Sequence, residues 1–276
     1  MKKKKYGIIG KPLSHSLSPL LHNFWFKKYN ISSSYKLIEI EKNKIGEIIN
    51  KIKRKELQGI NITTPYKQAV IPFLDIIIND AKETSSVNTI YLNNQNKIVG
   101  ENTDVYGFDH SFIEKLKEKD LEEKFFLILG AGGVTPSIIC ALNKKNIKKI
   151  FISNRTVEKA KKIREQFPFI KIIEWEKIEN ETQNMDVIIN ATSLGMKNGK
   201  DFKNEIRKFK PKMLYYDVIY NPIETKMLKS FKKKNIKTFN GLDMFLFQGQ
   251  KSFHLWNKIR PEIDRELKEM IISNLK

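Results

Sequence analysis

Cysteine and histidine are scarce in the sequence. Cys140 is the only cysteine among 276 residues, and four histidines are present. A single cysteine excludes an intramolecular disulfide framework and any metal site built from several thiolates, and it is typical of a reducing compartment. His15 and His22 lack the spaced carboxylate or cysteine partners of a metal site. We therefore expect a cytoplasmic protein that uses no metal ion.

Long apolar runs are also missing. The lysines after Met1 imitate the basic start of a signal peptide, but the apolar stretch that follows, residues 6–10, ends at Lys11 and Pro12. That stretch is too short for the apolar core of a signal peptide. No run approaches the roughly 20 apolar residues that a membrane-spanning helix needs. We expect a soluble protein that has no membrane partner.

Acidic residues are outnumbered by basic ones. The 51 Lys and Arg exceed the 31 Asp and Glu, which gives a formal net charge of +20. A field of this sign attracts polyanions, so a nucleic-acid-binding protein is one alternative. The lysines are scattered through every segment, however, and a charge that is spread out gives only non-specific attraction. We expect no specific nucleic-acid partner, and a small anionic substrate would gain from the same field.

The first part of the chain alternates strand and helix periodicity. Helices are expected from Ser18, with Ser18 as the N-cap and Pro19 at N1, over residues 44–55, and from Pro65. The polar residues 93–96 form the turn of a hairpin. The strands of this block are expected over residues 5–10, 34–39, 59–63, 87–92 and 97–100.

A second alternating block follows a helix that is expected over residues 107–119. Such alternation is typical of a mostly parallel, doubly wound sheet. From Met244 onward the pattern is helical, and Pro261 starts a last helix. The strands of this block are expected over residues 125–129, 149–153, 170–174, 186–190 and 214–218.

A glycine turn joins the strand at 125–129 to the next helix. Gly130 allows a tight turn, and Gly132 lets the backbone approach a pyrophosphate at the helix N-terminus. Thr135 stands where the G-x-G-x-x-G pattern has its third glycine, so an ordinary strand-to-helix turn stays open as an alternative. The loop residues that we expect to bind the cofactor are Gly130, Ala131, Gly132 and Gly133.

The next strand ends in residues that favour NADP over NAD. NAD-specific loops place an acidic residue here, whereas an arginine accommodates the 2′-phosphate of NADP. This sequence has Arg155 between Asn154 and Thr156, and Lys159 adds a charge one helical turn later. Arginine forms two parallel hydrogen bonds with a phosphate. The alternative is that Arg155 and Lys159 are two more surface cations.

Motifs that carry a family resemblance run in order along nearly the whole chain. In the first block they are residues 10–19 (GKPLSHSLSP), 22–23 (HN), 61–67 (NITTPYK), 87–89 (VNT), 100–104 (GENTD) and 107–108 (GF). In the second block they are the turn at 130–133 and residues 154–156 (NRT), 190–196 (NATSLGM), 216–222 (YDVIYNP), 241–244 (GLDM) and 248 (Q). Together they resemble the shikimate dehydrogenase family.

The resemblance implies NADP-linked interconversion of 3-dehydroshikimate and shikimate in aromatic amino acid biosynthesis. It implies Lys67 and Asp104 as the catalytic pair. Hydride delivery to a ketone builds negative charge on the oxygen, which an ammonium stabilises or protonates while a carboxylate orients it. Which of the two transfers the proton stays open. The substrate-binding residues that the resemblance implies are Ser16, Ser18, Thr63, Asn88, Tyr220 and Gln248. Further cofactor-binding residues are Ala191, Thr192, Ser193, Gly241 and Met244.

The resemblance also implies an α/β architecture of two domains. Residues 1–105, completed by 243–276, form the substrate domain, and residues 106–242 form a Rossmann-like, doubly wound NADP-binding domain. We expect a monomer or homodimer whose partner is a small-molecule substrate. Two alternatives stay open: a quinate/shikimate dehydrogenase with relaxed substrate or cofactor choice, and a non-catalytic homologue that binds ligand. Ser85-Ser86 and Asp243 depart from the family pattern, and Asp243 adds negative charge beside the expected nicotinamide site.

Overall fold

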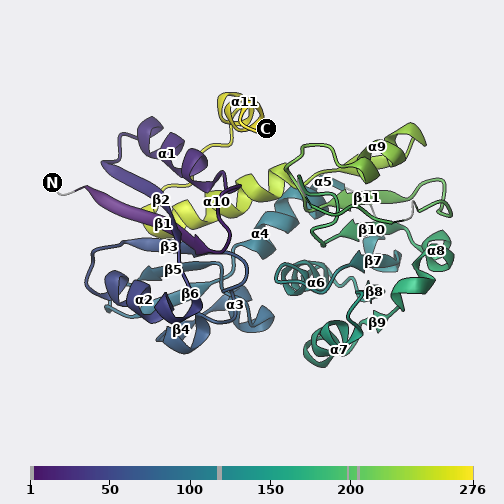
Figure 1. Ribbon diagram of the computed structural model, residues 1–276, viewed down its shortest axis with the longest axis horizontal. Coiled ribbons are helices and arrows are strands. Elements are labelled where there is room, and N and C mark those ends of the chain that lie inside the picture. Colours follow the sequence, from purple (N-terminus) through teal and green to yellow (C-terminus); the bar gives the residue numbers. More distant parts are fainter. Residues whose placement is uncertain (1–2, 117–119, 198, 204–205, 276) are drawn as a thin grey trace. The chain divides into compact units, whose positions relative to one another are not determined.

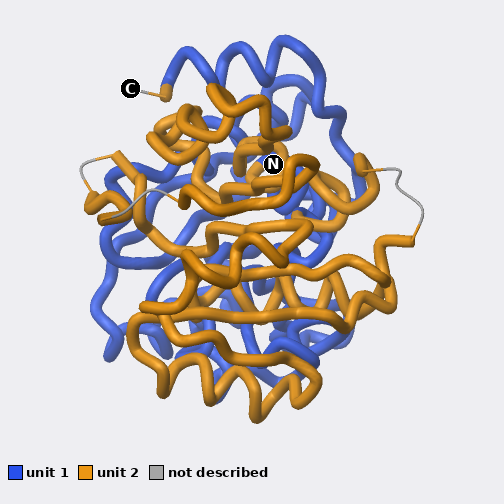
Figure 2. Tube along the Cα trace, turned by 90° about the vertical axis from the view of Figure 1, so that its right-hand side faces the viewer, with its two compact units in different colours: residues 1–107, 246–274 blue, residues 108–245, 275–276 orange. Residues whose placement is uncertain are grey.

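The structure is a computed structural model that describes residues 3–116, 120–197, 199–203 and 206–275. The chain divides into two compact units, which Figure 2 colours separately. Unit 1 comprises Met1–Gly107 and Leu246–Asn274, and unit 2 comprises Phe108–Phe245 with the last two residues. The expected domain boundaries lie close to these divisions. What each unit binds stays a prediction.

Unit 1 contains a mixed sheet with the strand order β2-β1-β3-β5-β6-β4 (Figure 1). β1 runs parallel to β2 and β3, whereas β5 runs antiparallel to β3 and β6. The expected hairpin is therefore confirmed as the β5–β6 pair. The bounds are β1 (Lys4–Gly10), β2 (Ser33–Glu39), β3 (Gly59–Ile62), β4 (Ile76–Ile77), β5 (Thr89–Leu92) and β6 (Ile98–Glu101).

Helix α2 (Ile45–Lys53) of unit 1 buries one apolar face against this sheet. α2 shows the reason in its sequence, because isoleucines recur at helical spacing and Ile45, Ile48 and Ile52 are all buried in one core cluster with strand residues. The helical segments are α1 (Ser18–Lys28), η1 (Lys42–Lys44), α2 (Ile45–Lys53), η2 (Ile71–Phe73), α3 (Asn79–Thr84), α4 (Asp104–Phe108), α10 (Leu242–Asn257) and α11 (Arg265–Ser273).

Two expected helix starts and one expected N-cap in unit 1 are wrong. The chain after Pro65 forms turns, because the Lys67 carbonyl accepts a hydrogen bond from Val87 and Pro72 has no N–H to extend a helix. α1 has Leu17 rather than Ser18 at its N-cap, since the Leu17 carbonyl accepts the first helical bond. α11 begins at Arg265 instead of Pro261, with the Asp264 side chain accepting from Leu267 N–H.

Unit 2 is built on a parallel sheet with the order β12-β11-β10-β7-β8-β9. All pairs in this sheet are parallel, which confirms the doubly wound, Rossmann-like expectation. β12 was not expected from the sequence. The strands are β7 (Phe126–Leu129), β8 (Ile150–Ser153), β9 (Lys171–Ile172), β10 (Val187–Asn190), β11 (Leu214–Asp217) and β12 (Lys237–Phe239). The helical segments are η3 (Asp109–Ile113), α5 (Glu114–Leu116), η4 (Leu121–Glu123), α6 (Thr135–Lys144), α7 (Val157–Gln166), η5 (Trp175–Lys177), α8 (Ile178–Glu181), η6 (Thr182–Asn184) and α9 (Lys226–Lys233).

The helix expected over residues 107–119 is interrupted by a change of helix type. The chain is α-helical in α4, π-helical in η3 and α-helical again in α5. Residues 117–119 of the expected helix lie outside the described residues. In a π-helical turn the backbone hydrogen bond joins residues five apart, and such turns are frequent at functional sites.

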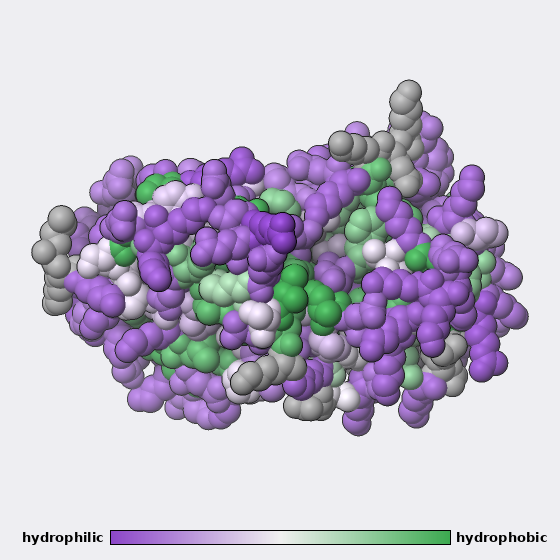
Figure 3. All heavy atoms as spheres, turned by 90° about the horizontal axis from the view of Figure 1, so that it is seen from above, coloured by the Kyte–Doolittle hydropathy of each residue, from purple (hydrophilic) through white to green (hydrophobic). Residues whose placement is uncertain are grey.

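One face of the molecule is mostly hydrophilic (Figure 3). On the face drawn in Figure 3, hydrophilic side chains cover most of the area and apolar ones gather in small groups. The large apolar side chains that are exposed in the described residues lie on separate elements: Leu37, Phe73, Phe125, Met196 and Ile272. None of the helices described is both long and apolar enough to span a bilayer.

His22 is a histidine enclosed by aromatic rings in the core of unit 1. Its ring stacks on Tyr35 at 4.4 Å and meets the edge of Trp25 at 5.7 Å. It is 0% exposed, and neither ring nitrogen has a hydrogen-bond partner among the described residues. Burial lowers the pKa of His22 to about 3, because the apolar surroundings disfavour the charged ring. The folded protein therefore holds His22 neutral well into acidic solution.

We expect His22 to make folding stability sensitive to acid. At pH values between 6.5, its ordinary pKa, and about 3, its pKa in the folded protein, His22 binds a proton in the unfolded chain but stays neutral in the folded one. As the pH is lowered through this window, the free energy of unfolding should therefore decrease by up to about 1.4 kcal/mol per pH unit. Urea unfolding at several pH values should show a shallower pH dependence for His22→Phe and His22→Leu than for the wild type.

The control for this prediction is the exposed histidine, His15. His15→Gln should keep the pH dependence of the wild type. Identical acid profiles for the wild type and both His22 variants would contradict the assignment of acid sensitivity to His22.

Candidate functional site

Lys67 and Asp104 form an ion pair that is largely shielded from water. Lys67 lies in the turns that follow β3, and Asp104 opens α4 directly after β6. The Lys67 Nζ donates to Asp104 Oδ2 at 2.5 Å, and the two side chains are 14% and 9% exposed. Low exposure strengthens such a pair, because little water competes for either charge. The structure thus brings together the two residues predicted to be catalytic.

Asn88 fixes the orientation of the Asp104 carboxylate. The backbone N–H of Thr103 donates to Asn88 Oδ1 at 2.7 Å, so the other end of the amide, Nδ2, must be the group that faces Asp104 Oδ1 at 2.9 Å. Asp104 Oδ1 therefore accepts from an amide, which leaves Oδ2 as the oxygen that faces Lys67. The Asp104 backbone N–H donates to Asn102 Oδ1 at 2.9 Å, which anchors the start of α4.

Of the predicted carboxylate-binding serines, Ser16 lies in the loop after β1 and Ser18 is the first residue of helix α1. Ser16 Oγ donates to Ser18 Oγ at 3.2 Å, so the two hydroxyls are neighbours. Thr63 follows β3, the neighbour of β1, and its N–H donates to Ile9 O at 2.9 Å. A Cβ on Gly10 would lie 2.4 Å from the Thr63 methyl group, so glycine is needed for the two loops to approach.

The other two predicted substrate-binding residues belong to different units. Gln248 lies on α10 in unit 1, and its carbonyl accepts from Ser252 Oγ at 3.0 Å. Tyr220 follows β11 in unit 2, and its ring stacks on Phe245 with 4.6 Å between centroids. The substrate role of each stays a prediction.

The glycine turn of unit 2 is closed on one side and open on the other. Gly130 has φ +109°, and a Cβ there would lie 2.9 Å from the Ala191 carbonyl oxygen. Gly132 is exposed, and its added Cβ would meet nothing closer than that oxygen at 3.9 Å. Thr135 stands at the position of the third glycine in the G-x-G-x-x-G pattern, and its hydroxyl donates to Gly130 O at 3.0 Å. Open backbone before the helix N-terminus of α6 fits a pyrophosphate.

Asn154 bridges the glycine turn and the loop after β8. Its Oδ1 accepts from Ala131 N–H at 3.1 Å, and its Nδ2 donates to Thr156 O at 2.8 Å. Both ends of this side chain are therefore engaged in holding the two loops together. Arg155 and Lys159 are exposed, and no carboxylate in the described part of the chain pairs with Arg155. The Arg155 guanidinium is available for an anion, as a 2′-phosphate requires.

The buried Asp217 holds the loop after β10 in place, a role that was not predicted from the sequence. Asp217 Oδ1 accepts from Asn190 Nδ2 at 3.1 Å, and Asn190 Oδ1 accepts from the backbone N–H of Thr192 at 3.0 Å. Burial raises the pKa of Asp217 to about 6, opposed by hydrogen bonds from Ile219 N–H and the Thr225 hydroxyl. Through these bonds Asp217 shapes the segment that contains Ala191, Thr192 and Ser193.

Gly241 and Met244 flank the start of α10. A Cβ on Gly241 would lie 2.0 Å from the Val218 carbonyl oxygen, so only glycine fits against that strand end. Met244 is buried. Asp243, which adds charge where the family often has glycine, forms an ion pair with Lys115. That pair compensates the negative charge that the sequence placed beside the expected nicotinamide site.

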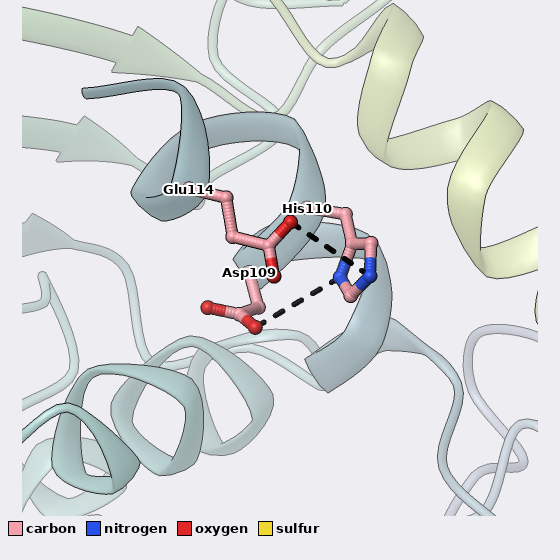
Figure 4. Close-up of side chains that lie close together, drawn as sticks. All are labelled: Asp109, His110 and Glu114. Atoms are coloured by element: carbon pink, nitrogen blue, oxygen red, sulfur yellow. Dashed lines mark ion pairs between the residues drawn. The ribbon is translucent and has the colours of Figure 1, made fainter. Parts of the chain in front are cut away.

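Three side chains of unit 2 form a group that Figure 4 draws in close-up. His110 faces Asp109 through Nδ1 and Glu114 through Nε2, at 3.8 Å each (Figure 4). One ligand atom from each of the three side chains lies within 4.8 Å of the other two. Lys145 also pairs with Asp109 at 3.4 Å. The group carries no metal assignment.

The fold, the Lys–Asp pair of unit 1 and the glycine turn of unit 2 define a class of protein. Its members are α/β proteins that combine a Rossmann-like unit with a second α/β unit containing a Lys–Asp pair. The family model for the shikimate dehydrogenase substrate binding domain matches residues 8–90. The model for shikimate / quinate 5-dehydrogenase matches residues 113–236. The chain belongs to the shikimate dehydrogenase family.

Individual relatives match over nearly the full length. The chain is 47% identical over 264 residues to shikimate dehydrogenase (NADP(+)) of Pelagibacter ubique, covering 96% of this chain and 97% of that one. The crystal structure of shikimate 5-dehydrogenase from Thermus thermophilus with NADP(H) and shikimate has a TM-score of 0.85 at 25% identity, covering 97% and 98% of the two chains. Quinate dehydrogenase from Corynebacterium glutamicum with NAD has a TM-score of 0.88 at 26% identity, covering 98% and 99%.

Proposed function

We propose that this chain catalyses the NADP-linked, reversible reduction of 3-dehydroshikimate to shikimate. The observation that carries the proposal is the shielded Lys67–Asp104 pair, with Asn88 fixing the carboxylate. NADP dependence is supported by Arg155, which pairs with no carboxylate among the residues that the structure describes, and by the relative from Pelagibacter ubique, whose name specifies NADP(+). The proposal includes a cytoplasmic role in aromatic amino acid biosynthesis, with a monomer or homodimer as the working form.

The chemistry divides between the cofactor and the chain. Bound NADPH supplies the hydride to the ketone carbon, and NADP accepts it in the reverse direction. In reduction, Lys67 places an ammonium near the developing alkoxide, where it stabilises the charge or donates the proton. Asp104 Oδ1 accepts a hydrogen bond from Asn88, so the proton passes between Lys67 Nζ and the other carboxylate oxygen of Asp104, Oδ2. The pair thus handles one proton for each hydride transferred.

The remaining residues bind and orient the two reactants. The Ser16 and Ser18 hydroxyls donate to the carboxylate of the substrate. The hydroxyl groups of the substrate are contacted by Thr63, Asn88, Tyr220 and Gln248. In unit 2, the open backbone at Gly132 receives the pyrophosphate and Arg155 the 2′-phosphate. The other proposed cofactor-binding residues are Gly130, Ala131, Gly133, Asn154, Thr156, Lys159, Ala191, Thr192, Ser193, Gly241 and Met244.

A second candidate is a dehydrogenase that also accepts quinate or NAD. It is favoured by the family model, whose description includes quinate, and by the similarity to a quinate dehydrogenase that binds NAD. The Ser16–Ser18 pair does not distinguish the two acids, because both carry a carboxylate. Arg155 is the feature that favours NADP over NAD.

The experiment that tests the proposal measures reduced cofactor formed from shikimate or quinate, each with NADP or NAD. We expect turnover confined largely to shikimate with NADP. Comparable rates with quinate or NAD would support the broader dehydrogenase. Absence of turnover in all four combinations, with shikimate binding retained in calorimetry, would identify a non-catalytic homologue and contradict the proposal.

A further inference from the structure

Asn61 is a polar residue inside the buried strand β3, with 5% of its surface exposed. Its Nδ2 carries two hydrogens and lies within hydrogen-bond distance of three acceptors: the carbonyl oxygen of Asn88 at 3.1 Å, Thr89 Oγ1 at 3.1 Å and Ser252 Oγ at 3.0 Å. A backbone carbonyl only accepts, so the amide orientation of Asn61 is fixed. Asn61 is therefore the centre of a network directly behind Asn88.

Tyr35 holds the other end of the Asn61 side chain. Its hydroxyl donates to Asn61 Oδ1 at 2.7 Å. Burial raises the pKa of Tyr35 well above its ordinary value, and a hydrogen bond with the Ser18 side chain opposes that rise. The Tyr35 hydroxyl thus stays protonated, and it joins Asn61 to one of the serines proposed to bind the substrate carboxylate.

Ser252 supports the same amide from helix α10. It is 0% exposed, and its hydroxyl lies 2.8 Å from Thr89 Oγ1 and 3.2 Å from Thr103 Oγ1 while donating to Gln248 O at 3.0 Å. The hydroxyls of Thr89 and Thr103 both reach Asn88 Oδ1, at 3.0 Å and 3.1 Å. Ser252 Oγ is therefore one of the three acceptors around Asn61 Nδ2, beside the two threonines that hold Asn88.

We propose that Tyr35 and Ser252 are positioning residues of the reaction: they hold the Asn61 amide, and Asn61 keeps Asn88 and Asp104 aligned with Lys67. The inference rests on the proposed function, since the alignment matters only if Asp104 and Lys67 handle the proton. Neither Tyr35 nor Ser252 needs to touch the substrate. Their effect reaches the chemistry through hydrogen bonds that are all inside unit 1.

Removing one hydroxyl at a time tests the proposal. Ser252→Ala should lower kcat for shikimate oxidation about ten-fold, the loss expected when one buried hydrogen bond no longer aligns the transition state. The KM for NADP should not change. Tyr35→Phe should lower kcat by a similar factor and also raise the KM for shikimate, because Tyr35 is bonded to Ser18.

Unit 2 offers matched controls for both substitutions. Ser111 is a buried serine that donates to Phe108 O at 3.2 Å and meets the Tyr216 hydroxyl at 3.0 Å. Ser111→Ala and Tyr216→Phe therefore remove equally buried hydroxyls that lie outside the network. They should reduce the melting temperature and leave kcat unchanged. A purely structural role of Tyr35 and Ser252 predicts the same behaviour for their variants.

The double variant separates a shared route from two independent effects. If Tyr35 and Ser252 both act through Asn61, the Tyr35→Phe/Ser252→Ala variant should lose little more kcat than the worse single variant. Losses that multiply, or a kcat per folded molecule equal to wild type in both single variants, would overturn the inference and leave the proposed function standing. A wild type that oxidises no shikimate would overturn both.

Discussion

Replacing Lys67 with alanine is expected to lower kcat for shikimate oxidation by about 10²- to 10⁴-fold, the range typical of a lost general acid or base. The reason is geometric. Lys67 is the cation that contacts Asp104 Oδ2 at 2.5 Å, and Asn88 Nδ2 donates to the other carboxylate oxygen, so among the described residues no second cation replaces the ammonium. Steady-state kinetics with saturating shikimate and NADP measures the loss.

Two further variants make this result specific. Small alkylamines added to Lys67→Ala should restore part of kcat, since they return an ammonium to the vacated space. Lys51→Met removes a lysine of helix α2 that pairs with Glu47 at the surface of unit 1, and it should retain wild-type kcat. A Lys67→Ala enzyme with kcat within a few-fold of wild type would contradict the assigned role.

Asp104→Asn tests the other half of the pair. An asparagine at this position can still accept from Asn88 Nδ2, but its amide nitrogen would then face the Lys67 ammonium, donor against donor. We expect a loss of kcat comparable to that of Lys67→Ala. The double variant should lose little more than either single variant, because the two residues act as one unit.

Arg155→Ala is expected to raise the KM for NADP about 10- to 100-fold and to leave the KM for NAD nearly unchanged. Hydrogen bonds to a charged group contribute about 1.5–3 kcal/mol, which corresponds to that range. The guanidinium is exposed and follows β8, at the strand end where doubly wound sheets bind the adenosine ribose. The measurement is the ratio of kcat/KM for the two cofactors.

The matched control for this substitution is Arg164→Ala. Arg164 is an exposed arginine in the last turn of helix α7, so the variant loses the same charge from the same unit. It should change the NADP/NAD ratio little. Equal effects of Arg155→Ala on both cofactors would show that Arg155 does not bind the 2′-phosphate.

Periodicity in the sequence was sufficient to predict most of the fold. The apolar strands β7, β8, β10 and β11 of unit 2 and the hairpin of unit 1 follow from their residue patterns, whereas β12 has only three residues, too few to show a period. The expected helix after Pro65 failed because two later features override the local pattern: Pro72, and the bond from Val87 to the Lys67 carbonyl.

The proposed catalytic pair, Lys67 and Asp104, could be inferred from the sequence only through the family motifs. Lys67 is one of many lysines, and 37 positions separate it from Asp104. Their contact depends on the sheet order, because the end of β3, the start of β5 and the end of β6 lie at one edge. Asn88 precedes β5 at that edge, which brings it to Asp104.

Buried polar partners were the least predictable part of the site. Asn61 and Asp217 were both visible in the motifs, yet a sequence does not show which groups surround a side chain. Asn61 gains its importance from Tyr35 and Ser252, which come from distant segments of the chain. A polar residue inside an apolar strand was the available signal, because such a residue must find partners when buried.

The most direct test of the account is to follow the hydrogen that is transferred. Shikimate carrying deuterium on the carbon that bears the oxidised hydroxyl would be incubated with the wild-type protein and NADP, and the cofactor analysed by mass spectrometry and NMR. The account predicts one deuterium on the nicotinamide ring of the reduced cofactor, with 3-dehydroshikimate as the product. Reduced cofactor without deuterium, or labelled shikimate recovered unchanged under conditions in which it binds, would contradict it.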